Sequence, residues 1–319
     1  MIGTRLGGPP GHPSRLAVAR PFAARGEILL GALLLIAGCE VVRFEDGASD
    51  TIRQTSQDLA DAFPRSLVDD SGREVRIAAP PDRILSLVPS ATPILMALGR
   101  TEWLVGRTDF DRDSALAHLP SVGGGLGASV ERIVSLRPRL VIRFDAGSDP
   151  ATPGQLDAAG IPHLAIRPDG IEDVLRIIEL LGVAVAREAA ADSLRTSLVG
   201  ELATVAEEVA GRPRPRVAIL LGGNPPLVAG GDTFLHELTE LAGGTNVLAD
   251  AGTLYAPMSV EAILQRSPDI LLLSEGSAPP RGLEGIPVRS LPLAVQIPGL
   301  DLGSSARLLA DLLHPDRAQ

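Results

Sequence analysis

The chain has 319 residues, room for two domains of ordinary size, and its hydrophobic fraction of 45% fits a protein with buried cores. Acidic residues outnumber basic ones by 39 to 29, and the formal net charge of -10 excludes a nucleic-acid surface that depends on phosphate contacts. The single cysteine, Cys39, excludes intrachain disulfides and CxxC metal or redox motifs.

Cys39 ends a segment that has the three parts of a secretory signal. Arginines precede an apolar run at 28–37, and Gly38 separates that run from the cysteine. About ten apolar residues are too few to cross a bilayer, which takes roughly 20. The letters IAGC at 36–39 also resemble a bacterial lipobox. We therefore expect a lipoprotein signal peptide over 1–38 and lipidation of Cys39; the alternative is a buried cysteine in an N-terminal helix.

The next residues, 39–62, are polar and acidic without a clear period, so we expect a tether. Apolar runs then follow one another with helical and strand-like lengths. They predict short helices at 93–98, after Ser129 and at 155–159, and strands at 83–88, 103–107, 140–144 and 163–167. This alternation predicts an N-terminal lobe of parallel strands with crossover helices over 63–170.

Helical periodicity dominates the following segment, 171–211, which we expect to link two lobes. Its second helix, predicted at 187–210, would be about 36 Å long at 1.5 Å per residue, the width of a small domain. Beyond it, strands at 216–221 and 270–273 and a helix at 233–242, capped by Asp232, predict a C-terminal lobe over 212–319.

One unit occurs in both lobes. The letters SVERIV at 129–134, with Pro138 beyond, match SVEAIL at 259–264, with Pro268 beyond, and a strand-like run follows each proline. The predicted fold class is therefore α/β, with two Rossmann-like lobes of parallel sheet joined by one long bridging helix.

These segments resemble, in order and spacing, the substrate-binding proteins of cobalamin and iron-siderophore ABC importers, and most of all the vitamin B12-binding type. The resemblance runs from about Phe63 to the C-terminus. Its letters are VDDSGREV at 68–75, PDRILSLVPS at 81–90, LPSVGG at 119–124, NPP at 224–226, SPD at 267–269 and LHP at 313–315. It implies a monomer without a permanently bound cofactor, which delivers a small metal chelate to a permease and, through it, to an ATPase.

The resemblance also implies roles for Glu131 and Glu261, which match the glutamates that contact arginines of the permease. From the residues alone, each carboxylate lies two positions after a serine N-cap. There the helix dipole favours a carboxylate by roughly 0.3–1 kcal/mol, so helix capping remains the alternative.

Open α/β lobes bind ligands at the carboxyl ends of their strands. Aromatic residues make up only 3% of the chain, and three of them, Phe110, Phe144 and Tyr255, fall near predicted strand ends. Matched to cobalamin-binding relatives, they take the places of corrin contacts, with Asn224 and Leu227 as further ligand residues. Each of the three aromatic residues taken alone also fits a core position.

Other ligands remain open, because the chain lacks aromatic residues that cobalamin binders often carry. It has Gly124, Gly125 and Leu126 before the first docking helix and Leu227 after the Asn-Pro-Pro turn. Cobalamin is the expected ligand; heme, another corrinoid or a ferric siderophore are the alternatives. A strongly anionic chelate would require converging arginines, and the candidates near the predicted cleft are Arg107, Arg112 and Arg143.

Neither a bound metal ion nor catalysis is expected. Four histidines follow Cys39 without paired spacing: His118, His163, His236 and His314. No nucleophile elbow, P-loop or GxGxxG after a strand occurs, so an enzyme that processes a metal chelate is only the minor alternative. We expect an extracytoplasmic protein, in the periplasm or at the cell surface, held to a bacterial membrane by its lipid and without a nucleic-acid partner.

Overall fold

The computed structural model describes residues 56–124, 129–145 and 151–318. The expected signal peptide, Cys39 and most of the expected tether lie outside these residues. The last part of the tether region contains helix α1 (Ser56–Asp61), in which Gln57 Nε2 donates to Asp61 Oδ1 at 3.0 Å. Over the described ranges, no helix combines the length and the apolar character needed to cross a membrane.

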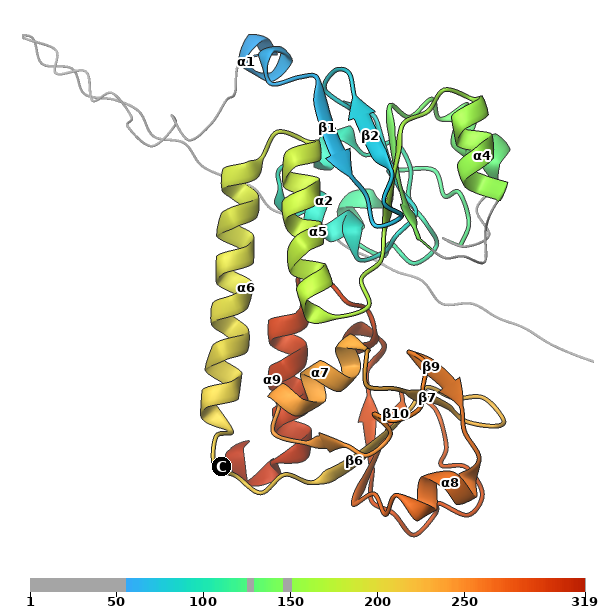
Figure 1. Cartoon of the computed structure of the whole chain (residues 1–319), viewed down its shortest axis with the longest axis vertical. Helices are drawn as coiled ribbons and strands as arrows, with labels where there is room; N and C mark the ends of the chain where they lie inside the picture. Colours follow the sequence, from blue (N-terminus) through green and yellow to red (C-terminus); the bar gives the residue numbers. More distant parts are fainter. Residues whose placement is uncertain (1–55, 125–128, 146–150, 319) are drawn as a thin grey trace, which may run out of the picture. The chain divides into compact units, whose positions relative to one another are not determined.

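The N-terminal lobe opens with a hairpin, formed by β1 (Arg65–Val68) and β2 (Glu74–Ile77) around the VDDSGREV segment. Three parallel strands follow in the order β3-β4-β5: β3 (Ile84–Ser86), β4 (Leu140–Phe144) and β5 (His163–Ile166) (Figure 1). Its helices are α2 (Ala91–Ala97), α3 (Val130–Ser135) and α4 (Ala151–Ala158), with 3-10 turns η1 (Thr101–Trp103) and η2 (Ser114–Leu116).

The strand predicted at 103–107 is wrong. Leu104 makes one isolated parallel bridge, to Ile84, and Arg107 makes one to Ser121, so the segment pairs only at single residues and forms no continuous strand. Its apolar character comes from packing, because Leu104 is buried in the core of the lobe. Gly106 allows the close approach: a Cβ there would lie 2.7 Å from Leu136 Cδ1.

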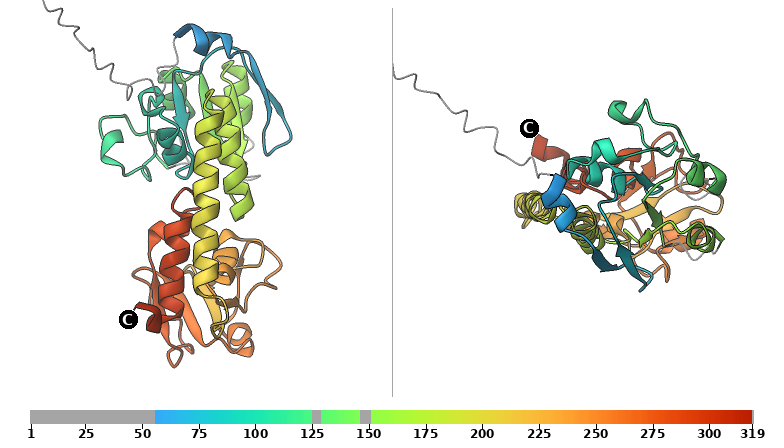
Figure 2. Two further views of the ribbon diagram at one scale, coloured as in Figure 1. Left: turned by 90° about the vertical axis from the view of Figure 1, so that its left-hand side faces the viewer. Right: turned by 90° about the horizontal axis from the view of Figure 1, so that it is seen from above.

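Two helices connect the lobes, α5 (Ile171–Ala184) and α6 (Glu188–Glu208). Helix α6 runs alongside both lobes (Figures 1 and 2). The 21 residues of α6 correspond to a length of about 32 Å. Gly182 of α5 allows the two helices to touch, since a Cβ there would lie 2.4 Å from the Cβ of Ala191. The long bridging helix predicted at 187–210 is confirmed as α6.

The C-terminal lobe has a mixed sheet. Its parallel part is β6 (Arg216–Leu220), β8 (Thr245–Asn246), β10 (Ile270–Ser274) and β11 (Val288–Leu291), whereas β7 (Leu227–Ala229) and β9 (Tyr255–Pro257) are antiparallel. The antiparallel strands were not predicted, because three residues are too few for a recognisable pattern. The remaining elements are α7 (Phe234–Leu241), α8 (Val260–Gln265), α9 (Leu302–Leu313), η3 (Leu293–Gln296) and η4 (Pro315–Ala318).

Thr233, and not Asp232, caps α7. Its hydroxyl accepts a hydrogen bond from the backbone N–H of His236 at 3.1 Å. Both residues have N-cap side chains, and the extended backbone at Thr233 decides which one is used.

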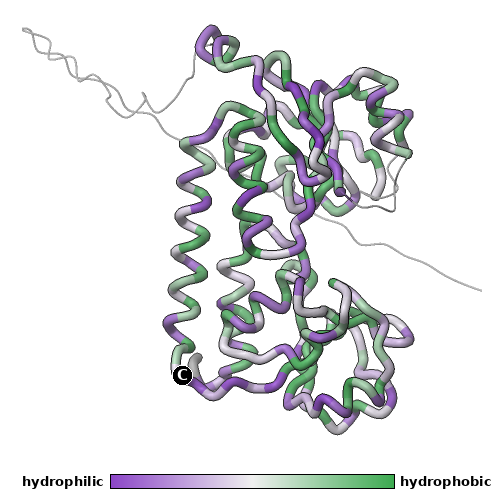
Figure 3. Tube along the Cα trace, in the orientation of Figure 1, coloured by the Kyte–Doolittle hydropathy of each residue, from purple (hydrophilic) through white to green (hydrophobic). Residues whose placement is uncertain are grey.

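The apolar side chains of each sheet divide between two faces, as the alternation along a strand requires. In β4, Leu140 and Ile142 join a core that continues through α5 and α6 into the C-terminal lobe, while Val141 faces an outer cluster under α3 and α4. Figure 3 shows the apolar positions gathered where these helices meet the sheets. One shared core therefore holds both lobes and the linking helices together.

Candidate ligand cleft and docking face

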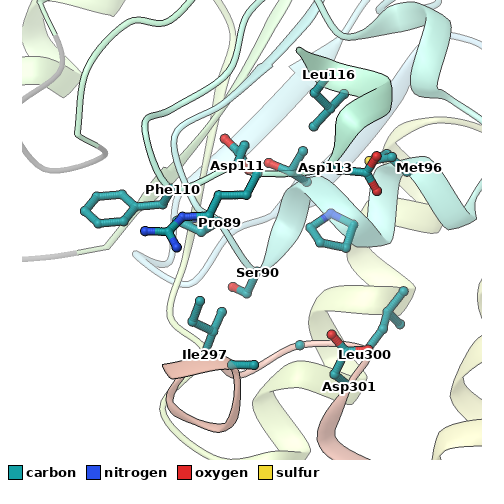
Figure 4. A pocket seen from close by; sticks show the side chains of 15 residues that line it. Pro89, Ser90, Met96, Phe110, Asp111, Asp113, Leu116, Ile297, Leu300 and Asp301 are labelled. Carbon is teal, nitrogen blue, oxygen red and sulfur yellow. The ribbon is translucent and has the colours of Figure 1, made fainter. Parts of the chain in front are cut away.

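Three neighbouring pockets form one cleft between the lobes, because adjacent pockets share lining residues. The largest of the three, of about 560 Å³, shares Phe144 and Pro168 with a second pocket of about 250 Å³. The second pocket shares Phe110 with a third pocket of about 180 Å³. Figure 4 shows the third pocket, with Phe110, Ser90 and Asp111 from the N-terminal lobe and Ile297, Leu300 and Asp301 from the C-terminal lobe.

The three aromatic residues singled out in the sequence all line this cleft. Phe144 ends β4, Tyr255 opens β9, and Phe110 lies in the loop beyond Arg107. Phe110 is 56% exposed and Tyr255 38% exposed, so the described residues leave a large part of each aromatic side chain uncovered. The structure thus brings together aromatic side chains from both lobes.

Asn224 and Leu227 lie elsewhere. Asn224 is in the turn between β6 and β7, and Leu227, the first residue of β7, is 36% exposed. Neither lines the three pockets of the cleft. The structure therefore does not group these two predicted ligand residues with the aromatic ones.

The charged lining of the cleft is mainly acidic and was missed in the sequence. Among the described residues, its cations are Arg112 and Arg167, and its carboxylates are Asp111, Asp113, Asp145, Asp169 and Asp301. Arg167 is already paired with Asp145, which directly follows β4. The rule that ligands bind at the carboxyl ends of strands would have indicated Asp145.

Two of the three arginines expected near the cleft point elsewhere. Arg143 lies on β4 and its Nε donates to Nδ1 of His163 at 3.0 Å, while Arg107 donates to the Thr108 carbonyl at 3.1 Å. Side chains alternate along a strand, so Arg143 must leave the face that Phe144 lines. Only Arg112 of the three lines the cleft.

Tyr255 is held in its neutral form. Burial of its hydroxyl, with a smaller contribution from the charge of Asp169, raises its pKa to about 12. Burial likewise raises the pKa of Asp169. At neutral pH the side chain is a neutral phenol, as an ordinary tyrosine also is, and it lines the cleft.

Glu131 and Glu261 are exposed at the second positions of α3 and α8. Ser129 caps α3 by accepting from the Arg132 N–H at 3.4 Å, and its hydroxyl donates to Glu131 Oε2 at 2.8 Å, which lowers the pKa of this glutamate. Among the described residues, neither glutamate forms an ion pair. Both carboxylates are therefore available to an outside cation.

The family model described as "Periplasmic binding protein" matches residues 84–286, a range with strands of both lobes. The chain belongs to the periplasmic binding protein family. As such, it is the substrate-binding component of an ABC importer of the type that carries vitamin B12, heme or siderophores, a transport component that works outside the cytoplasm with a permease and an ATPase.

Three relatives illustrate this periplasmic binding protein's similarities. The "Uncharacterized ABC transporter substrate-binding lipoprotein YvrC" of Bacillus subtilis (strain 168) is 29% identical over 255 residues, 78% of this chain and 79% of that protein. The vitamin B12-binding protein of Salmonella typhimurium (strain LT2) is 28% identical over 198 residues, 62% and 73% of the two proteins. The solved apo structure of the periplasmic heme-binding protein RhuT from Roseiflexus sp. RS-1 has 29% identity and a TM-score of 0.62, covering 74% of this chain and 99% of that one.

Two histidines of this periplasmic binding protein, His163 and His314, lie in the interior of the fold. His163 is fully buried, and His314 Nε2 lies 3.2 Å from the Ala242 carbonyl oxygen. Within 56–124, 129–145 and 151–318, no group of three or more His, Cys, Asp or Glu side chains is placed to hold a metal ion.

Proposed function

We propose that the chain captures a corrinoid between its two lobes. The observation that carries this proposal is an apolar cleft, walled by Phe110, Phe144 and Tyr255, whose charged rim has five carboxylates and two guanidiniums. A macrocycle suits the aromatic walls, because large flat apolar ligands gain most of their affinity from such surfaces.

The sign of the rim charge separates the candidate ligands. A corrin ring carries amide side chains, which donate hydrogen bonds to carboxylates and add no negative charge. Heme has two carboxylates of its own, and ferric siderophores are commonly anionic, so both would face repulsion from Asp111, Asp113 and Asp301, which form no ion pair among the described residues. The pairing of Arg167 with Asp145 further reduces the positive charge open to an anion.

Heme is the second candidate, supported by the 29% identity with a heme-binding protein. The cleft also offers a tyrosine, Tyr255. Its raised pKa opposes ligation of iron through a phenolate, because the proton would first have to be lost.

Spectral titration of the purified protein with cobalamin, cobinamide, heme and a ferric siderophore tests the ligand. We expect stoichiometric binding of a corrinoid at least tenfold tighter than binding of the other two classes. Tighter binding of heme or of the siderophore would replace the corrinoid with that ligand.

We also propose that Glu131 and Glu261 bind arginines of the permease, since fixed carboxylates suit bidentate guanidinium contacts. Helix capping does not require their side chains, because the serine hydroxyl makes the capping bond in α3 and in α8. The variant Glu131→Arg with Glu261→Arg should bind ligand normally and fail to support transport in vesicles that carry the cognate permease. Normal transport by this variant would refute docking through these residues.

A lipid anchor at Cys39 completes the proposal. Its support is the IAGC sequence at 36–39 and the word lipoprotein in the name of the Bacillus subtilis relative. We assign 1–38 to the signal peptide, 39–62 to the tether, 63–170 and 212–319 to the lobes, and 171–211 to the linking helices. A tether of this kind would keep the lobes near the permease.

A further inference from the structure

The unit that carries each glutamate has the same structure in both lobes, at an offset of 130 residues. Over 131–140 and 261–270, the sequence of buried and exposed positions is the same except at Arg132 and Ala262. Arg137 and Ser267 both have φ 46°, and both precede a proline. The peptide N–H groups of Arg139 and Asp269 each donate, at 2.7 Å, to the carbonyl of an arginine at the start of a strand: Arg83 directly before β3 and Arg216 as the first residue of β6.

Each unit has one aliphatic side chain that is exposed at the surface and not packed in a core. Ile133 and Ile263 are fully buried and anchor the two helices on the outer face of their sheets. The next residues, Val134 and Leu264, are 38% and 44% exposed. A single exposed valine or leucine is ordinary, but the same exposure at equivalent places in two lobes calls for a shared reason.

These aliphatic side chains share a face with the glutamates. Val134 lies three residues after Glu131, and Leu264 three residues after Glu261, so the two side chains of each pair are neighbours on the surface of their helix. Figure 1 shows α4 and α8 on the side of their lobes away from α6, and α3 packs against α4. That side is free of the linking helices.

We infer that each docking contact has two parts, a carboxylate and an aliphatic knob, Glu131 with Val134 and Glu261 with Leu264. This inference rests on the proposed docking function and specifies the partner. The permease would present two copies of one surface, each with an arginine beside an apolar depression, as two equivalent subunits do.

The aliphatic knob would strengthen the neighbouring ion pair by excluding water from it. Water that reaches an exposed ion pair weakens it, and such pairs contribute little. An aliphatic side chain pressed against the partner excludes that water, as the apolar surroundings of interface hot spots do. The arginine stem is itself apolar and extends the contact around the charge.

The variant Val134→Ser with Leu264→Ser tests the knobs. We expect its affinity for the detergent-solubilised or vesicle-bound permease and ATPase complex to fall by about 10- to 100-fold, while its ligand titration stays that of the wild type. The matched control is Val68→Ser with Val199→Ser, whose aliphatic side chains are 66% and 43% exposed on β1 and α6. The control should keep wild-type affinity for the permease complex.

Further variants keep the outcomes distinct. Val134→Leu with Leu264→Val retains both knobs, so it should dock normally and shows whether a defect of the serine variant reflects lost apolar contact. If Glu131→Ala with Glu261→Ala abolishes docking while the serine variant docks as the wild type does, the knobs are refuted and the glutamates stand. If the alanine variant docks normally, docking through these helices is itself refuted. Equal loss in the serine variant and in the control would also refute the knobs.

Discussion

Glu237 on α7 accepts a hydrogen bond from the backbone N–H of Ile171 at 2.6 Å, which ties the first residue of α5 to the C-terminal lobe. Beside it, the N–H of Phe234 donates to the Asp169 carbonyl at 2.6 Å. The segment that leaves the N-terminal lobe is therefore fixed to the other lobe before the linking helices begin. Together with α6, this connection restrains the spacing of the lobes.

Removal of this bond should destabilise the protein. Glu237→Ala leaves the Ile171 N–H without its acceptor, and loss of a hydrogen bond to a charged group costs about 1–3 kcal/mol. Urea unfolding should show a lower midpoint, and hydrogen exchange at Ile171 should accelerate. Glu172→Ala, at an exposed position in the same turn of α5, is the control and should change both measurements little. Unchanged exchange at Ile171 in Glu237→Ala would show that the bond does not restrain the lobes.

Tyr255 should titrate far above the usual range of a tyrosine. It is the only tyrosine of the chain, so phenolate absorbance near 295 nm reports this residue directly. With the pKa raised from 10.0 to about 12, the folded protein holds the proton more tightly than the unfolded chain does. Stability from this group is present below pH 10 and declines as the pH rises toward 12. A midpoint near 10 in folded protein would contradict the burial of this hydroxyl.

Acid should weaken the N-terminal lobe through His163. Burial, with the nearby guanidiniums of Arg73 and Arg143, lowers its pKa below 6.5, while Asp157 opposes them. Arg143 Nε donates to Nδ1, and Arg73 Nη2 lies 2.6 Å from the same nitrogen, so Nδ1 is an acceptor and the imidazole is neutral. The unfolded chain therefore binds the proton more readily, and stability falls as the pH drops below 6.5 toward the lowered pKa.

Urea midpoints at pH 7 and pH 5 measure this effect. His163→Asn keeps an acceptor for the arginines without a titratable ring, and it should lose less stability between the two pH values than the wild type does. His118→Asn, which replaces an exposed histidine, should behave as the wild type does. An equal loss of stability in wild type and His163→Asn would assign the acid sensitivity to carboxylates.

Lipidation of Cys39 is tested in cells. A fatty-acid analogue should label the wild type and not Cys39→Ser, because a thioether to the lipid requires the thiol. Since Cys39 is the only cysteine, no other thiol can take the label. Equal labelling of both proteins would exclude the anchor.

The parts of the fold that sequence predicted well have strong local signals. The buried strand β10 opens with four consecutive apolar residues, and β4 is apolar except at Arg143. Serine caps with prolines beyond mark α3 and α8. The antiparallel strand β9 lacked such a signal, because Tyr255 and its two neighbours pair only through contacts with the distant β7. Local pattern does not report pairing of this kind.

The residues of the cleft also differ in how strongly the local sequence indicates them. Phe110, Phe144 and Tyr255 were found because aromatic residues are scarce and end or follow strand-like runs. The acidic rim was missed because Asp111, Asp301 and the other aspartates are ordinary loop residues until the two lobes bring them together. The direction of the Arg143 side chain was predicted wrongly because it depends on the register of β4. A shift of one residue along a strand moves a side chain to the opposite face of the sheet.

The aromatic walls give the most direct test of the cleft. Phe110, Phe144 and Tyr255 line adjoining pockets, and Phe110 and Tyr255 are only partly covered by the residues that the structure describes. Replacement of each by alanine should weaken corrinoid binding by about 1–3 kcal/mol, the usual cost of truncating an aromatic anchor. Phe144→Ala should cost the most, because this side chain borders both larger pockets.

Spectral titration of the three single variants and of the triple variant measures the effect, with unfolding curves to show that each one folds. Leu227→Ala is the matched control: it truncates an exposed apolar side chain outside the cleft and should bind as the wild type does. Separate losses that add in the triple variant would indicate independent contacts with one ligand. If the folded triple variant binds every tested chelate as tightly as the wild type, the ligand site does not lie between these aromatic side chains. If Leu227→Ala alone loses binding, the ligand site lies beside β7.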